Sequence, residues 1–128
     1  MNDEKEFAAT KVTVRSGTGD DGFRDMIQQL DGLPALEELY LRSTEISDTA
    51  VQLVSDLRSL QILSVIKGPI TDAGLVCLES LCELKSLCLA EVNVTDEGLK
   101  HLKPLQKLER LWLNGTKVSD AGLGDIAQ

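Results

Sequence analysis

The sequence predicts one α/β domain, in which about five units of 24 residues stack into a curved, right-handed solenoid with a parallel sheet on the concave side and helices on the convex side. The segment 108–123 (LERLWLNGTKVSDAGL) recurs in variant form in steps of 24 residues, starting at positions 84, 60 and 36. Each copy has an L-x-x-L-x-L/V run with the alternation of a strand, followed by a polar turn and an apolar helical segment. The composition is 42% hydrophobic and only 3% aromatic, which favours a narrow core of aliphatic layers.

The first unit is atypical. Residues 11–15 (KVTVR) alternate polar and apolar side chains as a strand does, and the unit is 27 residues long instead of 24. Its helix is expected at roughly 21–30, with one apolar face formed by Phe23, Ile27 and Leu30. Because a terminal repeat covers the core on one side only, it is expected to differ from the others. We therefore interpret residues 1–32 as an N-terminal capping, degenerate first repeat, and residues 33–128 as four regular repeats of a single domain.

The regular units share a set of apolar positions, three in the strand, one in the turn and two in the helix. In the first three regular units these are Leu36, Leu39, Leu41, Ile46, Val51 and Val54; Leu60, Leu63, Val65, Ile70, Leu75 and Leu78; and Leu84, Leu87, Leu89, Val94, Leu99 and Leu102. We expect these side chains to form the core.

The start of each helix has its own repeated signal. A hydroxyl residue at the expected N-cap satisfies a free backbone N–H, which contributes about 1 kcal/mol; the column is Ser47, Thr71, Thr95 and Ser119. An aspartate follows in the first turn, where its charge meets the positive helix end; the column is Asp48, Asp72, Asp96 and Asp120. Two positions further stand Gly74, Gly98 and Gly122, with Ala50 in the remaining unit. Because glycine is costly inside a helix, we expect close packing against the neighbouring unit there.

These units resemble the leucine-rich repeat, and the tail T/G-x-[VI]-[ST]-D-x-G-L resembles its cysteine-containing type, known from F-box substrate receptors and many bacterial proteins. The resemblance covers roughly residues 33–124. It implies a protein-interaction module that binds partners on its concave strand face. The sequence departs from the common pattern at the Asn/Cys position after the strand, where it has Thr44, Gly68, Val92 and Thr116. Nothing in it resembles an F-box.

The net charge and the cysteine content indicate which partners and which cellular location to expect. A net charge of −8 disfavours generic binding to nucleic acid or to an anionic membrane, and no apolar run approaches the ~18 residues of a membrane helix. The three cysteines, an odd number, all fall inside the repeats; they are Cys77, Cys82 and Cys88. We expect free thiols and a reducing, cytoplasmic location.

The sequence offers no constellation for catalysis, a cofactor or a metal. Its single histidine, His101, shares a helical column with Cys77 one unit away, but two ligands do not make a zinc site. The segment 16–22 (SGTGDDG) lacks the ending of a phosphate-binding loop, and its aspartates would repel phosphate, so we interpret it as a turn. The aspartate column is explained by helix starts without calcium. We predict a protein that is not an enzyme and needs no cofactor.

The outward residues of the strands carry the functional signal. Alternation along a strand places one column on the centre of the concave face: Thr13, Tyr40, Ser64, Cys88 and Trp112. The flanking columns are Lys11, Glu38, Ile62, Ser86 and Arg110 on one side, and Arg15, Arg42, Ile66, Ala90 and Asn114 on the other. The only Tyr and the only Trp both lie in the central column, and the fifteen positions carry a formal +3 in a chain of net −8. Tyr, Trp and Arg are enriched at binding hot spots.

We therefore predict a non-catalytic module that binds a protein partner on this face, through an acidic or apolar segment. The expected contacts are Tyr40 and Trp112 as apolar anchors, Ile62 and Ile66 as a dry, exposed centre, Arg15, Arg42 and Arg110 as charged selectors, and the polar Cys88 and Asn114 beside them. Strand propensity alone also favours aromatic residues at such positions. The alternative function is a self-assembling domain that forms homodimers through open solenoid ends, since no polar closing unit follows the last helix.

Overall fold

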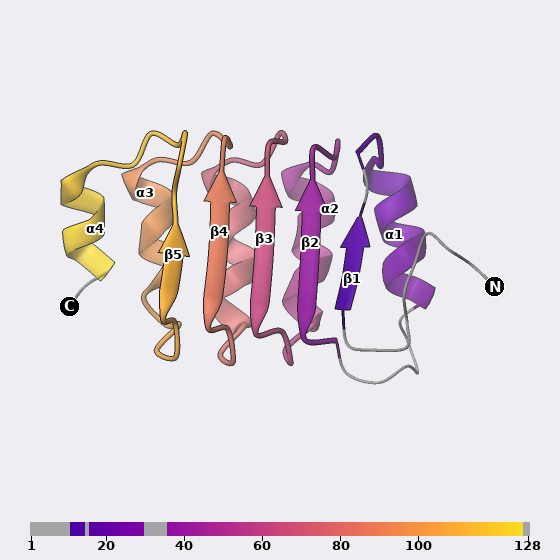
Figure 1. Ribbon diagram of the computed structural model, residues 1–128, viewed down its shortest axis with the longest axis horizontal. Helices are drawn as coiled ribbons and strands as arrows, with labels where there is room; N and C mark the ends of the chain where they lie inside the picture. Colours follow the sequence, from indigo (N-terminus) through magenta and orange to yellow (C-terminus); the bar gives the residue numbers. More distant parts are fainter. Residues whose placement is uncertain (1–10, 15, 30–35, 127–128) are drawn as a thin grey trace.

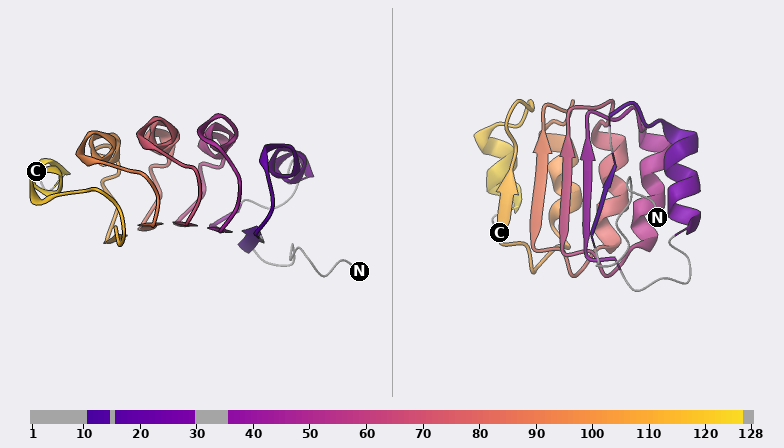
Figure 2. Two further views of the ribbon diagram at one scale, coloured as in Figure 1. Left: turned by 90° about the horizontal axis from the view of Figure 1, so that it is seen from above. Right: turned by 45° about the vertical axis from the view of Figure 1, so that its right-hand side comes forward.

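A parallel sheet with helices on one side forms the architecture of the computed structural model, which describes residues 11–14, 16–29 and 36–126. The strands run in chain order and are β1 (Lys11–Val14), β2 (Glu38–Arg42), β3 (Ile62–Ile66), β4 (Ser86–Ala90) and β5 (Arg110–Trp112). Each strand returns to the next through a helical segment on the same side of the sheet (Figure 1). Seen from above, the strands lie closer together than the helices, so the sheet forms the concave side (Figure 2).

The strand register is the one that the 24-residue period predicts. Thr13 pairs with Tyr40, and the same row continues through Ser64 and Cys88 to Trp112. All of the core positions predicted in the first three regular units are buried, with exposed fractions of 6% or less. Five units of about 24 residues thus form one continuous core.

The helical segments of the regular units are short, and several are partly or wholly 3₁₀. The first unit has a true helix, α1 (Asp20–Gln29), which buries Phe23 and Met26, while Ile27 is partly buried and the predicted Leu30 lies outside the described residues. The later units are mostly 3₁₀: α2 (Asp48–Val51) continues as η1 (Gln52–Asp56), η2 (Asp72–Ser80) is 3₁₀ throughout, and α3 (Asp96–Leu99) continues as η3 (Lys100–Leu102). The last segment is α4 (Asp120–Ile126). Nine residues span about 18 Å as a 3₁₀ helix but only about 14 Å as an α-helix. Fewer residues are therefore needed to lead the chain back past the length of a strand.

A ladder of carboxylate hydrogen bonds joins each unit to the next. Asp72 accepts hydrogen bonds from the backbone N–H (2.8 Å) and the hydroxyl (2.6 Å) of Thr95, one unit further on. The same pair of bonds joins Asp20 to Ser47, Asp48 to Thr71, and Asp96 to Ser119. The aspartates do lie in first turns as predicted, but their carboxylates fasten the following unit as well, which the sequence interpretation missed.

The hydroxyl column has a double role. Thr71, Thr95 and Ser119 accept a hydrogen bond from the backbone N–H two residues further on, at 3.2–3.3 Å, while Ser47 makes no such bond. The predicted capping bond is therefore confirmed in three units. Ser47 is the N-cap residue of α2 as predicted, but its hydroxyl makes no capping bond. In all four units the hydroxyl hydrogen is donated to the preceding unit's aspartate.

The glycine column completes this junction. A Cβ atom built on Gly98 would lie 2.9 Å from Asp72 Cγ and 3.0 Å from Leu75 Cδ1, and still closer to the carboxylate oxygen. Gly74 and Gly122 face the aspartate of the preceding unit in the same way. The predicted reason for these glycines, close packing on the neighbouring unit, is confirmed, and the neighbour is the ladder carboxylate.

Candidate protein-binding surface

The outward side of the sheet, here called the concave face, consists of the side chains that the register places in three adjacent columns. The described members are Lys11, Thr13, Glu38, Tyr40, Arg42, Ile62, Ser64, Ile66, Ser86, Cys88, Ala90, Arg110, Trp112 and Asn114. Arg15, predicted to belong to it, lies outside the described residues. Asn114 follows β5 and is exposed, and its carbonyl accepts a hydrogen bond from the N–H of Glu91 (2.7 Å).

Trp112 is the most prominent apolar group of this face. It is 47% exposed although it is the largest side chain of the sequence. Because β5 places it beside the small Cys88, nothing on the neighbouring strand matches its height. An indole in this position is free to bury a large area against a partner.

Tyr40 makes more contacts within the protein than an apolar anchor for a partner requires. Its hydroxyl donates a hydrogen bond to Glu38 Oε1 (2.9 Å), and Lys11 Nζ lies 5.2 Å from the centre of its ring, within cation–π range. Burial, and then the bond to Glu38, raise the pKa of Tyr40 above its ordinary value. Tyr40 thus forms a local cluster with Lys11 and Glu38 and presents only part of its surface.

The centre of the face is less exposed than predicted. Ile62 and Ile66, predicted to be exposed, are half-buried. Ser64 and Ser86 are each only 7% exposed. The outward residues of β4 are all small. They form a strip of low surface, here called the low row of β4, which separates Ile62 and Ile66 from Arg110 and Trp112.

The two described arginines of the face have no acidic partner. Arg42 and Arg110 are exposed, and among residues 11–14, 16–29 and 36–126 no carboxylate lies within 4.0 Å of either guanidinium. With Lys11 and Glu38 the described face carries three positive groups and one negative group, whereas the whole chain has a net charge of −8. The face is therefore positive on a negative protein.

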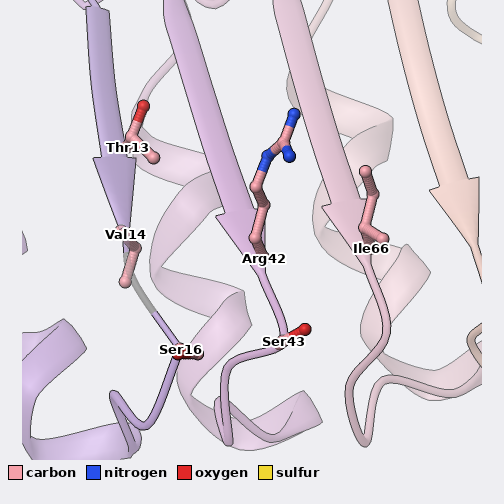
Figure 3. A pocket seen from close by; sticks show the side chains of 6 residues that line it. All are labelled: Thr13, Val14, Ser16, Arg42, Ser43 and Ile66. Carbon is pink, nitrogen blue, oxygen red and sulfur yellow. The ribbon is translucent and has the colours of Figure 1, made fainter.

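A hollow of about 590 Å³ opens at the ends of β1, β2 and β3, and it brings two of the predicted contacts together. Its lining consists of Thr13, Val14, Ser16, Arg42, Ser43 and Ile66. Figure 3 shows the Arg42 side chain folded back along β2, with its guanidinium over the space between β2 and β3. Ser16 and Ser43 were missed in the sequence, although they occupy the same position in turns of successive units, 27 residues apart.

The remaining reactive groups are the three cysteines and the single histidine. All three cysteines are free thiols; Cys77 is buried, and burial raises the pKa of its thiol to about 12, whereas Cys82 is exposed. His101 contacts the carboxylate of Glu79 through Nδ1, and the alternative pairing with Cys77 is not the one observed. Within the described part of the chain, no three His, Cys, Asp or Glu side chains converge on a point where they could hold a metal ion. In the same part, no helix is long and apolar enough to cross a membrane.

The period, the parallel sheet and the helical returns define a leucine-rich repeat solenoid, a class of domain that generally binds proteins. The fold is similar to the crystal structure of an internalin (inlF) from Listeria monocytogenes strain 4b F2365, with a TM-score of 0.64 and 28% sequence identity. The similarity covers 77% of this chain and 28% of the internalin chain. No protein-family model matches the sequence, and no curated protein matches it.

Proposed function

We propose that this domain is a non-catalytic interaction module that binds a protein partner on its concave face. The observation that carries the proposal is the exposure of Trp112, 47% of its surface, on a face that also holds two arginines without an acidic partner among the described residues. Solitary exposed side chains are common on protein surfaces, but a large aromatic that shares one face with two arginines has the composition of a hot spot.

The described residues divide into two groups on this surface. Trp112 anchors the partner, and the half-buried Ile62 and Ile66 line the low row of β4 that would receive an apolar side chain. Arg42 and Arg110 select an acidic segment, and Arg15 of the same column is proposed to join them. Tyr40 supports the face from within its cluster with Lys11 and Glu38.

The test compares two exposed apolar residues on opposite sides. Trp112→Ala is expected to weaken binding of a captured partner by about tenfold or more, which is the scale of a hot-spot truncation. Val76→Ala is the matched control, since Val76 is 45% exposed but lies on η2. Equal affinity of Trp112→Ala and the unmodified protein, with both folded by circular dichroism, would contradict the proposal.

A second candidate function, association of copies through the terminal layers, is favoured by the exposure of the last described layer. Leu123 is 41% exposed, and Leu111, Leu113 and Val118 are only partly buried. Sedimentation velocity over a range of concentrations tests it, because association through this layer is expected to be abolished by Leu123→Glu. A monomer at every concentration would rule it out for this chain.

We also propose a reducing, cytoplasmic location and the cysteine-containing repeat type. The free thiols of Cys77, Cys82 and Cys88 support the first proposal. The repeated [ST]-D-x-G segment supports the second. Location of the tagged protein in its source cells, together with thiol titration after rapid acid quenching, tests the compartment.

A further inference from the structure

We propose that the hollow at the ends of β1, β2 and β3 is a carboxylate subsite, which takes an acidic side chain of a partner segment that crosses the strands toward Trp112. This inference rests on the proposed function, since it names what one part of the concave face recognises. It is carried by the Arg42 guanidinium, which has no described acidic partner, by the hydroxyls that line the same hollow and by the distance from Arg42 to Trp112.

Arg42 supplies the charge complementarity. Its guanidinium is exposed and has no carboxylate within 4.0 Å among the residues that the structure describes. The only acidic residue of the same strand, Glu38, is engaged by the Tyr40 hydroxyl and lies four positions away, or about 13 Å along the strand. A planar guanidinium donates two parallel N–H bonds to a carboxylate, so Arg42 matches that group in charge and geometry.

The remaining lining fits an acidic side chain. Thr13, Ser16 and Ser43 bring hydroxyls that can donate to a carboxylate oxygen, and Ile66 offers an apolar wall for the methylene stem. The volume of about 590 Å³ lies within the usual range of ligand sites, about 300–1,000 Å³.

The distance from Arg42 to Trp112 predicts how far apart the two contacting residues lie in the partner segment. Arg42 and Trp112 are separated by three strand intervals, about 14 Å, and by two residues along the strands, about 7 Å. The direct separation of their backbones is thus about 16 Å, which an extended peptide spans with about five residues. We expect a partner segment with Asp or Glu and an apolar residue about five positions apart.

The subsite itself is tested with small probes. In ¹⁵N-resolved spectra of the full chain, N-acetyl-glutamate amide is expected to shift the backbone amides of Thr13, Ser43 and Ile66, whereas N-acetyl-glutamine amide is not. Arg42→Gln should abolish these shifts, while the matched control Arg110→Gln, which changes the other arginine of the face, should keep them. Equal shifts with the glutamine compound, shifts that survive Arg42→Gln, or shifts with inorganic phosphate alone would each overturn the carboxylate assignment.

The spacing is tested with labelled peptides that carry one Glu and one Leu separated by two to eight positions of a Gly-Ser chain. Fluorescence polarisation is expected to show the tightest binding near five positions, by about tenfold over the shortest peptide, because both contacts then form at once. Arg42→Gln and Trp112→Ala should each remove that advantage. Affinity that does not depend on spacing would overturn the inference. If a captured partner depends on Trp112 but not on Arg42, the proposed function stands and the subsite alone is wrong.

Discussion

Replacing Gly98 with alanine is expected to destabilise the domain by about 2–5 kcal/mol, although alanine is the better helix former. The new Cβ would lie 2.9 Å from Asp72 Cγ and 3.0 Å from Leu75 Cδ1, so the Asp72 carboxylate must leave its place. That carboxylate accepts two hydrogen bonds from Thr95, at 2.8 and 2.6 Å. Each bond to a charged group contributes about 1.5–3 kcal/mol, and the gain in helix propensity returns only about 1 kcal/mol.

The assay is urea unfolding followed by circular dichroism, with Gly124→Ala as the matched control. A Cβ built on Gly124 meets nothing within 4 Å, so the same substitution within α4 should be neutral or slightly stabilising. A double-mutant cycle with Asp72→Ala isolates the cause. Once the carboxylate is removed, Gly98→Ala should cost less than about 1 kcal/mol, since Leu75 can rotate away. If Gly98→Ala costs the same in both backgrounds, the carboxylate is not the obstacle and the reasoning is wrong.

Three further predictions concern acid, the thiols and the core. The pKa values of Asp20 and Asp96 are lowered, chiefly by hydrogen bonds from the serine of the next unit. A carboxyl whose pKa is lower in the folded chain stabilises the fold above its unfolded pKa of about 3.9 and loses that effect as the pH falls, so urea midpoints should drop below about pH 4, and less steeply in Asp96→Asn. A colorimetric thiol reagent at neutral pH should modify Cys82 within minutes but Cys77 only on unfolding, because burial raises the pKa of Cys77 to about 12; equal rates would contradict the burial. Leu87→Ala should cost about 2–5 kcal/mol in the same unfolding assay, because Leu87 is 0% exposed on β4, an inner strand of the sheet; a loss below about 1 kcal/mol would contradict its place in the core.

The sequence predicts the strands and their register because both follow from one number, the period. Once Tyr40, Ser64 and Cys88 occupy the same position of successive units, a parallel sheet must place them side by side. The buried positions follow in the same way, since the alternation decides which side chains point inward.

The junction between units is where the sequence interpretation was incomplete. Asp72 has a sufficient explanation inside its own helix, so nothing within that unit points to Thr95. The signal was nevertheless present: each ladder aspartate of a regular unit precedes its Ser or Thr partner by 23 residues, and a glycine follows three positions after that partner. The aspartate, hydroxyl and glycine columns are explained together only by contacts between units, and not by local helix propensity.

The exposed fraction of the side chains on the concave face could not be predicted from the sequence pattern either. Alternation gives the direction of a side chain but not the height of its neighbours. Ser64 and Ser86 point outward and are still buried; the register sets Ser64 beside Tyr40 and Ser86 beside Arg110, both much larger side chains. Tyr40 points outward as predicted, but Glu38 and Lys11 occupy its hydroxyl and its ring.

The three junctions between regular units have the same donors, acceptor and glycine, so these units can replace one another. Deletion of residues 60–83 removes one full period and would bring Asp48 against Thr95 and Gly98, a pairing with the same donors, acceptor and glycine as the pairs that it replaces. The strand of the first regular unit would then meet β4 with every column in register. A gene that encodes this domain can therefore gain or lose whole periods without creating a new kind of contact, so the length of the binding face can change while the chemistry that holds it together stays the same.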